Sequence, residues 1–264
     1  MTTTVHAATP LVDEADALTR HLPHYPADPS RFVFDASVTE VFDSMAMRSI
    51  PLYEEAHTMH VRMLRDWLQE PIVKVLDVGA SRGRFIDHIV AQHGAGRLGP
   101  QTATGGGIEI TALDISQPMC DVLQARYPQV DVRQQDLATP EFLYGPIAQY
   151  DIICAYYVLQ FLHPAYQVSV LRRLMALLKT GGVLIIGQKS AHGGRLGNLG
   201  HDYYIEWRMA NGYSRAEIEA KTHALAGSMW PMDESLVTLV LKEQAREIFE
   251  TTRVGVFNTL MARK

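Results

Sequence analysis

The sequence lacks the features that mark several large classes of protein. Only two of its 264 residues are cysteines, Cys120 and Cys154, too few for a disulfide framework or a cysteine-rich zinc site. It contains no apolar segment long enough to span a bilayer, and its beginning shows no basic flank followed by an apolar core. We therefore expect no membrane partner and, by elimination, a cytoplasmic location.

Positive charge is not in excess either. The formal net charge is −5 at pH 7, and no basic tract interrupts the chain. Bulk electrostatics therefore gives nucleic acids and anionic lipids no reason to bind. With 47% apolar and 20% charged residues, the composition is that of an ordinary globular enzyme. We expect a small-molecule substrate rather than a nucleic acid.

Two common nucleotide-binding fingerprints do not fit the loop after the first predicted strand, where a related glycine loop stands. Gly-x-Gly-x-x-Gly is excluded there because position 81 is Ser, and the Gly-Lys-Ser/Thr phosphate loop does not occur in the chain. Instead an apolar run, residues 73–78, leads through Asp77 into Gly79, Ser81 and Gly83. The run predicts a buried parallel strand, and Gly79 allows a ligand to approach the backbone. Ser81 is a candidate helix N-cap, and Gly83 allows close packing of helix and strand. A carboxylate at position 77 would repel a pyrophosphate and suit a cationic ligand.

Two further acids follow predicted strands. Asp114 ends the apolar run 108–113, and Asp136 follows the run 130–134. An acid at the end of a second strand is suited to accept hydrogen bonds from a ribose diol. Taken singly, each acid is more often a helix N-cap. Together they indicate a nucleoside site at the carboxyl edge of a parallel sheet.

The order of predicted elements indicates an α/β fold. Strands alternate with helices, and a final antiparallel pair follows, so we predict a Rossmann-like, mostly parallel seven-stranded sheet with helices on both faces. The predicted strands are 73–78, 108–113, 130–134, 150–158, 183–188, 246–252 and 256–262; the predicted helices between them include 118–127, 165–179 and 233–244. We expect a flexible tail over residues 1–31, an N-terminal helical lid over 32–70, and one domain over 71–264. That domain carries a helical insertion at 189–231, which begins with a flexible glycine-rich loop at 192–200.

The glycine loop resembles motif I of the class I S-adenosylmethionine (SAM) methyltransferases. This resemblance implies SAM as the cofactor, because its ammonium and sulfonium groups suit an acidic loop. It also implies cofactor contacts that run from the loop to the ends of the second and third strands. The implied cofactor-binding residues there are Asp77, Gly79, Ala80, Ser81, Gly83, Asp114, Ile115, Asp136 and Leu137. A tight strand–helix turn of an unrelated α/β protein is the alternative.

Five stretches are similar to the carboxy-SAM synthase family, whose members are related to tRNA wobble-uridine modification. They cover roughly residues 35–264 in collinear order: 41–45 with 48–53, the glycine loop, 159–164, 188–189, and 210–214 with 217–221. The resemblance implies that Arg48 and Tyr53 meet the amino-acid end of the cofactor, and that the backbone of Tyr156 faces its ammonium. It also implies a homodimer formed through the insertion.

The chain departs from that family at three positions. Thr222 stands where the synthases have an arginine that grips the extra carboxylate of carboxy-SAM, and a neutral hydroxyl cannot replace a bidentate charged group. Tyr156 replaces an asparagine, and Ala80 replaces a cysteine. We therefore favour methyl transfer to a small molecule, with carboxy-SAM synthesis from SAM and prephenate as the alternative and a non-catalytic SAM-binding protein as a third. His223 or Arg215 could substitute for the missing arginine.

The acceptor side of the site is less defined. If the acceptor carries a proton, a base is needed, and the candidate catalytic residues are Tyr157, His163 and His201. Tyr157 could instead be a packing residue of its strand, His163 a helix cap, and His201 a surface residue. His57 and His60 share a helix face, which suits either a metal or a packed pair; we expect the packed pair and no metal.

Overall fold

The computed structural model describes residues 34–99, 106–191 and 193–264. The predicted tail at 1–31 and part of the glycine-rich stretch near residue 100 lie outside the described residues. The strands are β1 (Ile72–Val78), β2 (Gly107–Asp114), β3 (Asp131–Gln134), β4 (Tyr150–Tyr156), β5 (Leu178–Ala191), β6 (Met232–Asp233), β7 (Glu247–Val254) and β8 (Phe257–Arg263). The helices are α2 (Ala36–Ser49), α3 (Tyr53–Met63), α4 (Arg65–Leu68), α5 (Arg84–His93), α6 (Gln117–Arg126), α7 (Pro140–Leu143), α8 (Pro164–Leu177), α9 (Gly194–Ala210), α10 (Arg215–Leu225) and α11 (Glu234–Lys242), with 3-10 turns η1 (Ala95–Arg97) and η2 (Leu159–Phe161).

The predicted sheet is confirmed, with one addition. Seven strands follow the order β3-β2-β1-β4-β5-β8-β7, and the two-residue strand β6 pairs with the end of β5 to make an eighth. Strands β1 to β5 are parallel, whereas β8 runs antiparallel to both β5 and β7. The parallel register aligns Asp77 of β1 with Ala112 of β2 and Cys154 of β4. The ends of the central strands therefore meet at one edge of the sheet.

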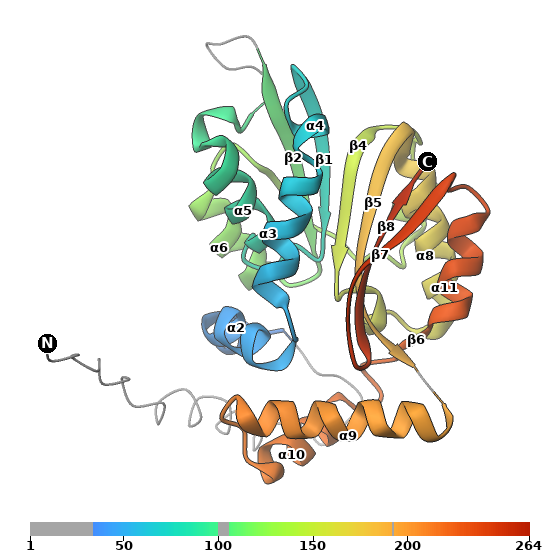
Figure 1. Ribbon diagram of the computed structural model, residues 1–264. Helices are drawn as coiled ribbons and strands as arrows, with labels where there is room; N and C mark the ends of the chain where they lie inside the picture. The colour runs from blue at the N-terminus through green and yellow to red at the C-terminus, as the bar shows by residue number, and fades with distance from the viewer. Residues whose placement is uncertain (1–33, 100–105, 192) are drawn as a thin grey trace, which may run out of the picture.

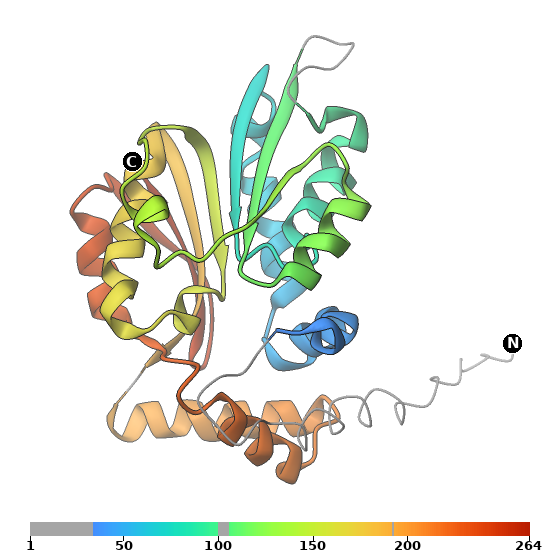
Figure 2. The ribbon, with the colours of Figure 1, turned by 180° about the vertical axis from the view of Figure 1, so that it is seen from behind.

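Helices cover both faces of the sheet, as Figures 1 and 2 show from opposite sides. On one face α3, α4 and α5 pack on β1, β2 and β4 through a fully buried apolar cluster that includes Val75, Phe85 and Ile86. On the other face α8 and α11 pack on β4 and β5 through a second cluster that includes Leu76, Leu174 and Leu184. Neighbouring residues of β1 thus belong to opposite layers, as the period of a strand requires.

The edge at which the parallel strands end is covered by α2, α9 and α10 (Figure 1). Most of the glycine-rich segment expected to be a loop at 192–200 is helical instead: α9 begins at Gly194, and residue 192 lies outside the described residues. A glycine inside a helix costs about 1 kcal/mol relative to alanine. Packing compensates here: Gly197 is buried, and a side chain at Gly200 would contact Val256, at the turn between β7 and β8.

The fifth strand also begins earlier than predicted. The helix predicted at 165–179 is followed by two glycines, Gly181 and Gly182, which are typical of a helix end. Helix α8 instead ends at Leu177, and Leu178 already pairs with Tyr150 across the sheet. The pairing shifts register immediately afterwards, and Gly181 lies in the irregular stretch with φ of 83°. Here glycine allows an irregularity within a strand rather than ending a helix.

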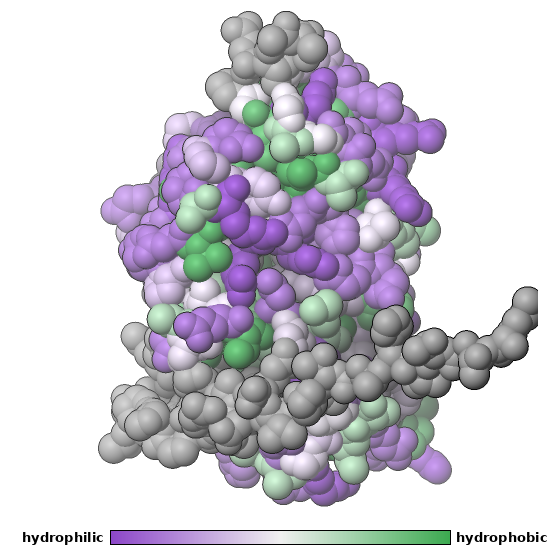
Figure 3. All heavy atoms as spheres, turned by 90° about the vertical axis from the view of Figure 1, so that its left-hand side faces the viewer, coloured by the Kyte–Doolittle hydropathy of each residue, from purple (hydrophilic) through white to green (hydrophobic). Residues whose placement is uncertain are grey.

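The outer surface that carries α5 and α6 is largely hydrophilic, with apolar side chains in small separate groups (Figure 3). Among the described residues, no helix combines the length and apolar composition that a bilayer crossing requires.

Candidate active site

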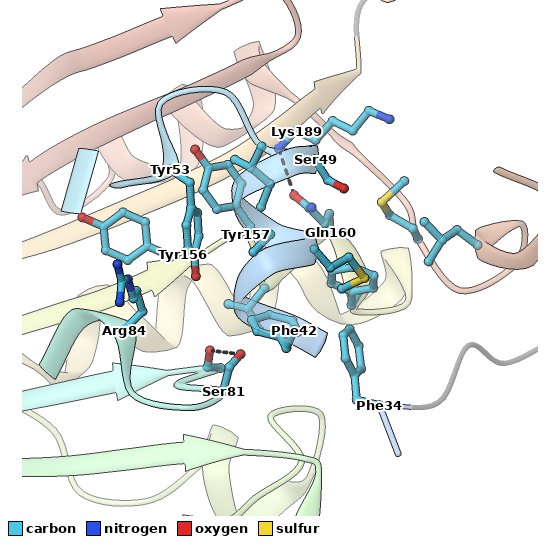
Figure 4. A pocket seen from close by; sticks show the side chains of 18 of the residues that line it. Phe34, Phe42, Ser49, Tyr53, Ser81, Arg84, Tyr156, Tyr157, Gln160 and Lys189 are labelled. Atoms are coloured by element: carbon cyan, nitrogen blue, oxygen red, sulfur yellow. Dashed lines mark hydrogen bonds between the residues drawn. The ribbon is translucent and has the colours of Figure 1, made fainter. Parts of the chain in front are cut away.

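A cavity of about 470 Å³ lies at the carboxyl edge of the sheet, beneath α2, α9 and α10. Its volume is within the range of small-molecule sites. The glycine loop after β1, the ends of β2 and β4, and helices from both ends of the chain all contribute to its wall. Figure 4 shows part of this wall, with Arg84 and Lys189 on opposite sides of a group of three tyrosines.

The glycine loop forms the wall next to β1, and two of its residues require a small side chain. Gly79 has φ of 66°, and a β-carbon there would lie 2.6 Å from Cγ2 of Val158. Gly83 has φ of 87°, and a β-carbon there would lie 2.4 Å from Cδ1 of Leu123 in α6. Gly83 therefore allows close approach of α6 rather than of the strand, and it does not line the cavity.

Ser81 does not cap the following helix. The N-cap of α5 is Gly83, and Ser81 adopts a left-handed conformation with φ of 49°. Its backbone N–H instead donates to Oδ2 of Asp114 over 2.8 Å. This bond fixes the loop to the end of the second strand, and both residues line the cavity.

The first two predicted acids lie in the cavity wall and are nearly inaccessible to solvent. Asp77 is 3% exposed; its Oδ1 accepts from Sγ of Cys154 over 3.0 Å, while its Oδ2 has no hydrogen-bond partner among the described residues. Burial, with a smaller contribution from Asp114, raises the pKa of Asp77 from 3.8 to about 7. Burial also raises the pKa of Asp114, although backbone N–H donors including that of Ser116 oppose the shift. An unpartnered buried carboxylate oxygen favours a ligand that brings a positive charge or a donor.

The residues expected to bind the cofactor at the ends of β2 and β3 also line the cavity. Ile115 is 58% exposed although it is apolar, so its side chain is available for contact with a ligand. Leu137 is buried next to it in the wall. Asp136 is exposed, and its Oδ1 accepts from the backbone N–H of Ala138 over 2.8 Å. Its side chain thus stabilises the loop that follows β3, and Asp136 borders the cavity.

The two N-terminal residues expected at the cofactor lie in different places. Tyr53, the first residue of α3, is buried in the cavity wall, and its ring centroid lies 6.2 Å from that of Tyr157. Arg48 does not line the cavity. Its Nε and Nη2 donate to the carbonyls of Asn211 and Gly212 over 3.0 and 3.1 Å. Arg48 therefore connects α2 to the turn between α9 and α10.

Tyr156 is held by two histidines on α3. Its ring stacks on His57 with centroids 4.0 Å apart, and its hydroxyl is bonded to Nδ1 of His60. The other ring nitrogen of His60 lies 2.7 Å from Oγ1 of Thr251, and Nδ1 of His57 donates to the carbonyl of Tyr53. Burial lowers the pKa of His57 to about 3 and that of His60 to about 4, so both rings are neutral at pH 7. Within the described ranges, no three histidine, cysteine or acidic side chains gather as metal ligands would.

The structure separates the three candidate bases. Tyr157 lines the cavity but is buried, and burial raises its pKa, so its phenol stays protonated at neutral pH. His163 caps α8, where its Nδ1 accepts from the backbone N–H of Ala165, and it does not line the cavity. His201, on α9, is solvent-exposed and also borders the cavity. Only His201 has both a suitable ring and access to the site.

Besides Arg84, which is paired with Glu54, three cations of the wall were not expected as site residues. They are Lys189 at the end of β5, Arg208 on α9 and Lys221 on α10. Lys189 and Lys221 lie in stretches that are similar to the synthase family, and this similarity could have identified them as site residues. Nothing in the local sequence distinguishes Arg208, because its burial depends on how α9 lies over the sheet.

Comparison with known proteins identifies the family. A model described as a methyltransferase domain matches residues 76–184. The carboxy-S-adenosyl-L-methionine synthase of Sodalis glossinidius (strain morsitans) is 30% identical over 206 residues, covering 75% of this chain and 76% of that protein. The chain belongs to the carboxy-SAM synthase family of class I SAM methyltransferases.

A second curated relative agrees with this placement, and a solved structure agrees with the fold. The synthase of Helicobacter hepaticus (strain ATCC 51449 / 3B1) is 29% identical over 243 residues, with coverage of 89% of this chain and 95% of that protein. Among solved structures, 1,6-didemethyltoxoflavin-N1-methyltransferase of Burkholderia thailandensis has a TM-score of 0.52 at 20% identity and covers 98% of this chain and 93% of its own. The resemblance seen in the sequence is thus confirmed, and with it the enzyme class and SAM as the cofactor.

The cavity of this carboxy-SAM synthase family member fits that cofactor. Gly79 leaves a concave backbone, Asp77 offers an unpartnered buried oxygen, and Ile115 presents an accessible apolar surface. A nucleoside that carries a positive charge needs these three features together.

Proposed function

We propose that this enzyme transfers the methyl group of SAM to a small-molecule acceptor. The observation that carries the proposal is that a neutral side chain, Thr222, lines the cavity. By the family resemblance, this is the position where the synthases have their arginine. The hydroxyl of Thr222 donates to the carbonyl of Ile218 over 2.8 Å, so it is bonded to its own helix. The two expected substitutes, Arg215 and His223, are exposed and do not line the cavity.

The proposed cofactor contacts follow from the wall. Asp77 would hold the ammonium, Asp114 the ribose hydroxyls, and Leu137 with Ile115 the adenine. Gly79, Ala80 and Ser81 would provide the backbone against which the methionyl part lies, with Tyr53 and Tyr156 opposite. When bound, SAM supplies a methyl carbon activated by a sulfonium, so the protein's task is to orient the acceptor and exclude water.

Proton removal, where the acceptor requires it, is proposed for His201. Tyr157 would orient the acceptor as a hydrogen-bond donor, because its raised pKa keeps the proton on the phenol. His163 is not proposed further, since it caps α8 outside the wall.

Carboxy-SAM synthesis is the second candidate. The names of the relatives favour it, and so does the presence of cationic side chains in the wall. One experiment separates the two: the protein is incubated with SAM and prephenate, and the cofactor is weighed by mass spectrometry. An unchanged cofactor supports methyl transfer, whereas a carboxylated cofactor would refute our interpretation of Thr222.

Cofactor binding itself is tested by calorimetry with SAM and S-adenosylhomocysteine. We expect saturable binding with one molecule per chain. Lack of binding up to millimolar concentration would end both candidates. Binding without methylation in a broad panel of acceptors would favour a non-catalytic role.

We also propose a homodimer formed through the insertion at 189–231. Its support is an apolar row on α9 at positions i, i+3 and i+7, consisting of Leu196, Leu199 and Tyr203, which are 82%, 56% and 47% exposed. Light scattering after gel filtration measures the mass, and a single chain mass would refute the dimer.

A further inference from the structure

Of the four lysines and arginines in the cavity wall, Arg84 is paired with Glu54. The other three, Lys189, Arg208 and Lys221, form a group of their own, which we call the cationic cluster. They come from β5, α9 and α10, so the cluster exists only where the insertion folds over the sheet. In Figure 4 the side chain of Lys189 extends on the side of the cavity opposite Arg84.

In the sheet, Lys189 is remote from Asp77, one of the acids that would hold the cofactor. Asp77 is aligned with Cys154 on β4, which is aligned with Ile185 on β5. Lys189 lies two strands across and four residues further along, or roughly 16 Å from Asp77 at about 4.8 Å per strand and about 3.3 Å per residue. We call the part of the cavity at Asp77 and Asp114 its acidic end and the part at the cationic cluster its basic end.

No acid neutralises the cluster in the part of the chain that the structure describes. Nε and Nη2 of Arg208 are buried without a hydrogen-bond partner, and its guanidinium lies over the rings of Tyr213 and Tyr204, 4.4 and 5.7 Å from their centroids. Nζ of Lys189 lies 4.9 Å from the centroid of Tyr204. Contacts with aromatic faces stabilise a cation less than a carboxylate does.

Lys221 has an equally poor set of partners. Its Nζ contacts Oγ of Ser49 at 3.4 Å, a long hydrogen bond. Burial, followed by the charges of Arg208, Arg48 and Lys189, lowers its pKa to about 7. Burial and Arg208 likewise lower the pKa of Lys189 to about 8. The cations therefore repel one another, and the folded protein bears the cost of keeping them together.

Buried charges that lack a counterion destabilise a protein unless a ligand provides one. We propose that Lys189, Arg208 and Lys221 form a subsite for an acidic group, a carboxylate or phosphate, of the methyl acceptor. This inference rests on the proposed function, in which the cofactor occupies the acidic end. Arg208 has two unused donors on one guanidinium, which suits an anion with two oxygens.

The experiment uses the full chain saturated with S-adenosylhomocysteine, so that cofactor binding is measured first and separately. Malonate, inorganic phosphate and prephenate are then titrated by calorimetry, with malonamide as the neutral counterpart of malonate. We expect the anions to bind and malonamide not to bind. Arg208→Gln and Lys221→Met should each weaken anion binding by about tenfold or more while leaving the affinity for S-adenosylhomocysteine unchanged.

A matched control is Lys242→Met, which removes an exposed lysine from α11 and should leave anion binding unchanged. Thermal melting without any anion gives a second measurement, because Lys221→Met should raise the melting temperature by removing an uncompensated charge. Equal binding of malonate and malonamide would overturn the proposal. So would variants that lose affinity for the cofactor but keep their affinity for anions, because the cluster would then serve the cofactor's own carboxylate.

Discussion

Replacement of Asp77 by asparagine should stabilise the cofactor-free protein at pH 8 and weaken SAM binding. The pKa of Asp77 rises from 3.8 to about 7 on folding, a shift of about 3 units, which corresponds to about 4 kcal/mol at about 1.4 kcal/mol per unit. Because the folded-state pKa is the higher one, the folded protein binds this proton more tightly. Stability is therefore lost as pH rises from about 4 to about 7, and the full cost of the ionised group is present at pH 8.

Asparagine removes that charge but leaves an amide donor where Oδ2 now lacks a partner. An unsatisfied buried donor costs about 1–3 kcal/mol, so the net gain in the free energy of unfolding at pH 8 is about 1–3 kcal/mol. At pH 4.5 the carboxyl is already protonated, and the gain should vanish. The affinity for SAM should fall by about 10- to 100-fold, since a hydrogen bond to a charged group contributes about 1.5–3 kcal/mol.

The assays are urea denaturation at the two pH values and calorimetry with SAM. Asp121→Asn is the control, because this exposed carboxylate on α6 accepts only a local bond from Gln117. Equal changes in stability at pH 4.5 and pH 8, or unchanged SAM affinity at pH 8, would refute the reasoning.

Three further changes test other parts of the structure. Gly79→Ala should abolish detectable SAM binding and destabilise the folded protein by about 2–4 kcal/mol, because the backbone there is left-handed and the new β-carbon would overlap Val158. The control is Gly94→Ala, at a position that also has a positive φ but where a β-carbon meets no neighbouring atom; its affinity for SAM, measured by calorimetry, should be unchanged. Tyr156→Phe should cost about 1–2 kcal/mol in urea unfolding, since it removes the hydroxyl bonded to the buried His60, whereas SAM affinity should persist; loss of SAM binding would show that the hydroxyl has a role in the site. Ala148→Gly should stabilise by about 0.5–1 kcal/mol, because exposed Ala148 has φ of 54° and glycine relieves a strain of about 1–2 kcal/mol at some entropic cost; a lower melting temperature would contradict this.

The sequence was most informative where a local pattern and the sheet geometry agree. The apolar runs that lead to Asp77 and Asp114 predicted β1 and β2. They also predicted the acids of the cavity, because parallel strands end at one edge. The α9 segment was mispredicted because its glycines indicate a loop, whereas packing of Gly200 near Val256 stabilises a helix. Such contacts join residues more than fifty positions apart, and no local pattern records them.

The basic end of the cavity could not be predicted from local sequence either. Lysines and arginines usually lie in solvent, so Arg208 gives no sign in the sequence that it is buried. Its role depends on aromatic rings of Tyr204 and Tyr213 that lie over it. The sequence could therefore predict which cofactor binds but not which charge the acceptor should carry.

The position of β8 has a consequence for the newly made chain. This strand follows β5 by more than sixty residues in the chain, yet it lies inside the sheet, between β5 and β7. Until β8 has been made and paired, one side of β5 is an unpaired edge of mostly apolar residues, the kind of edge that other chains can join. Pairing of β8 with β5 therefore closes an edge that is open to association in the unfinished fold.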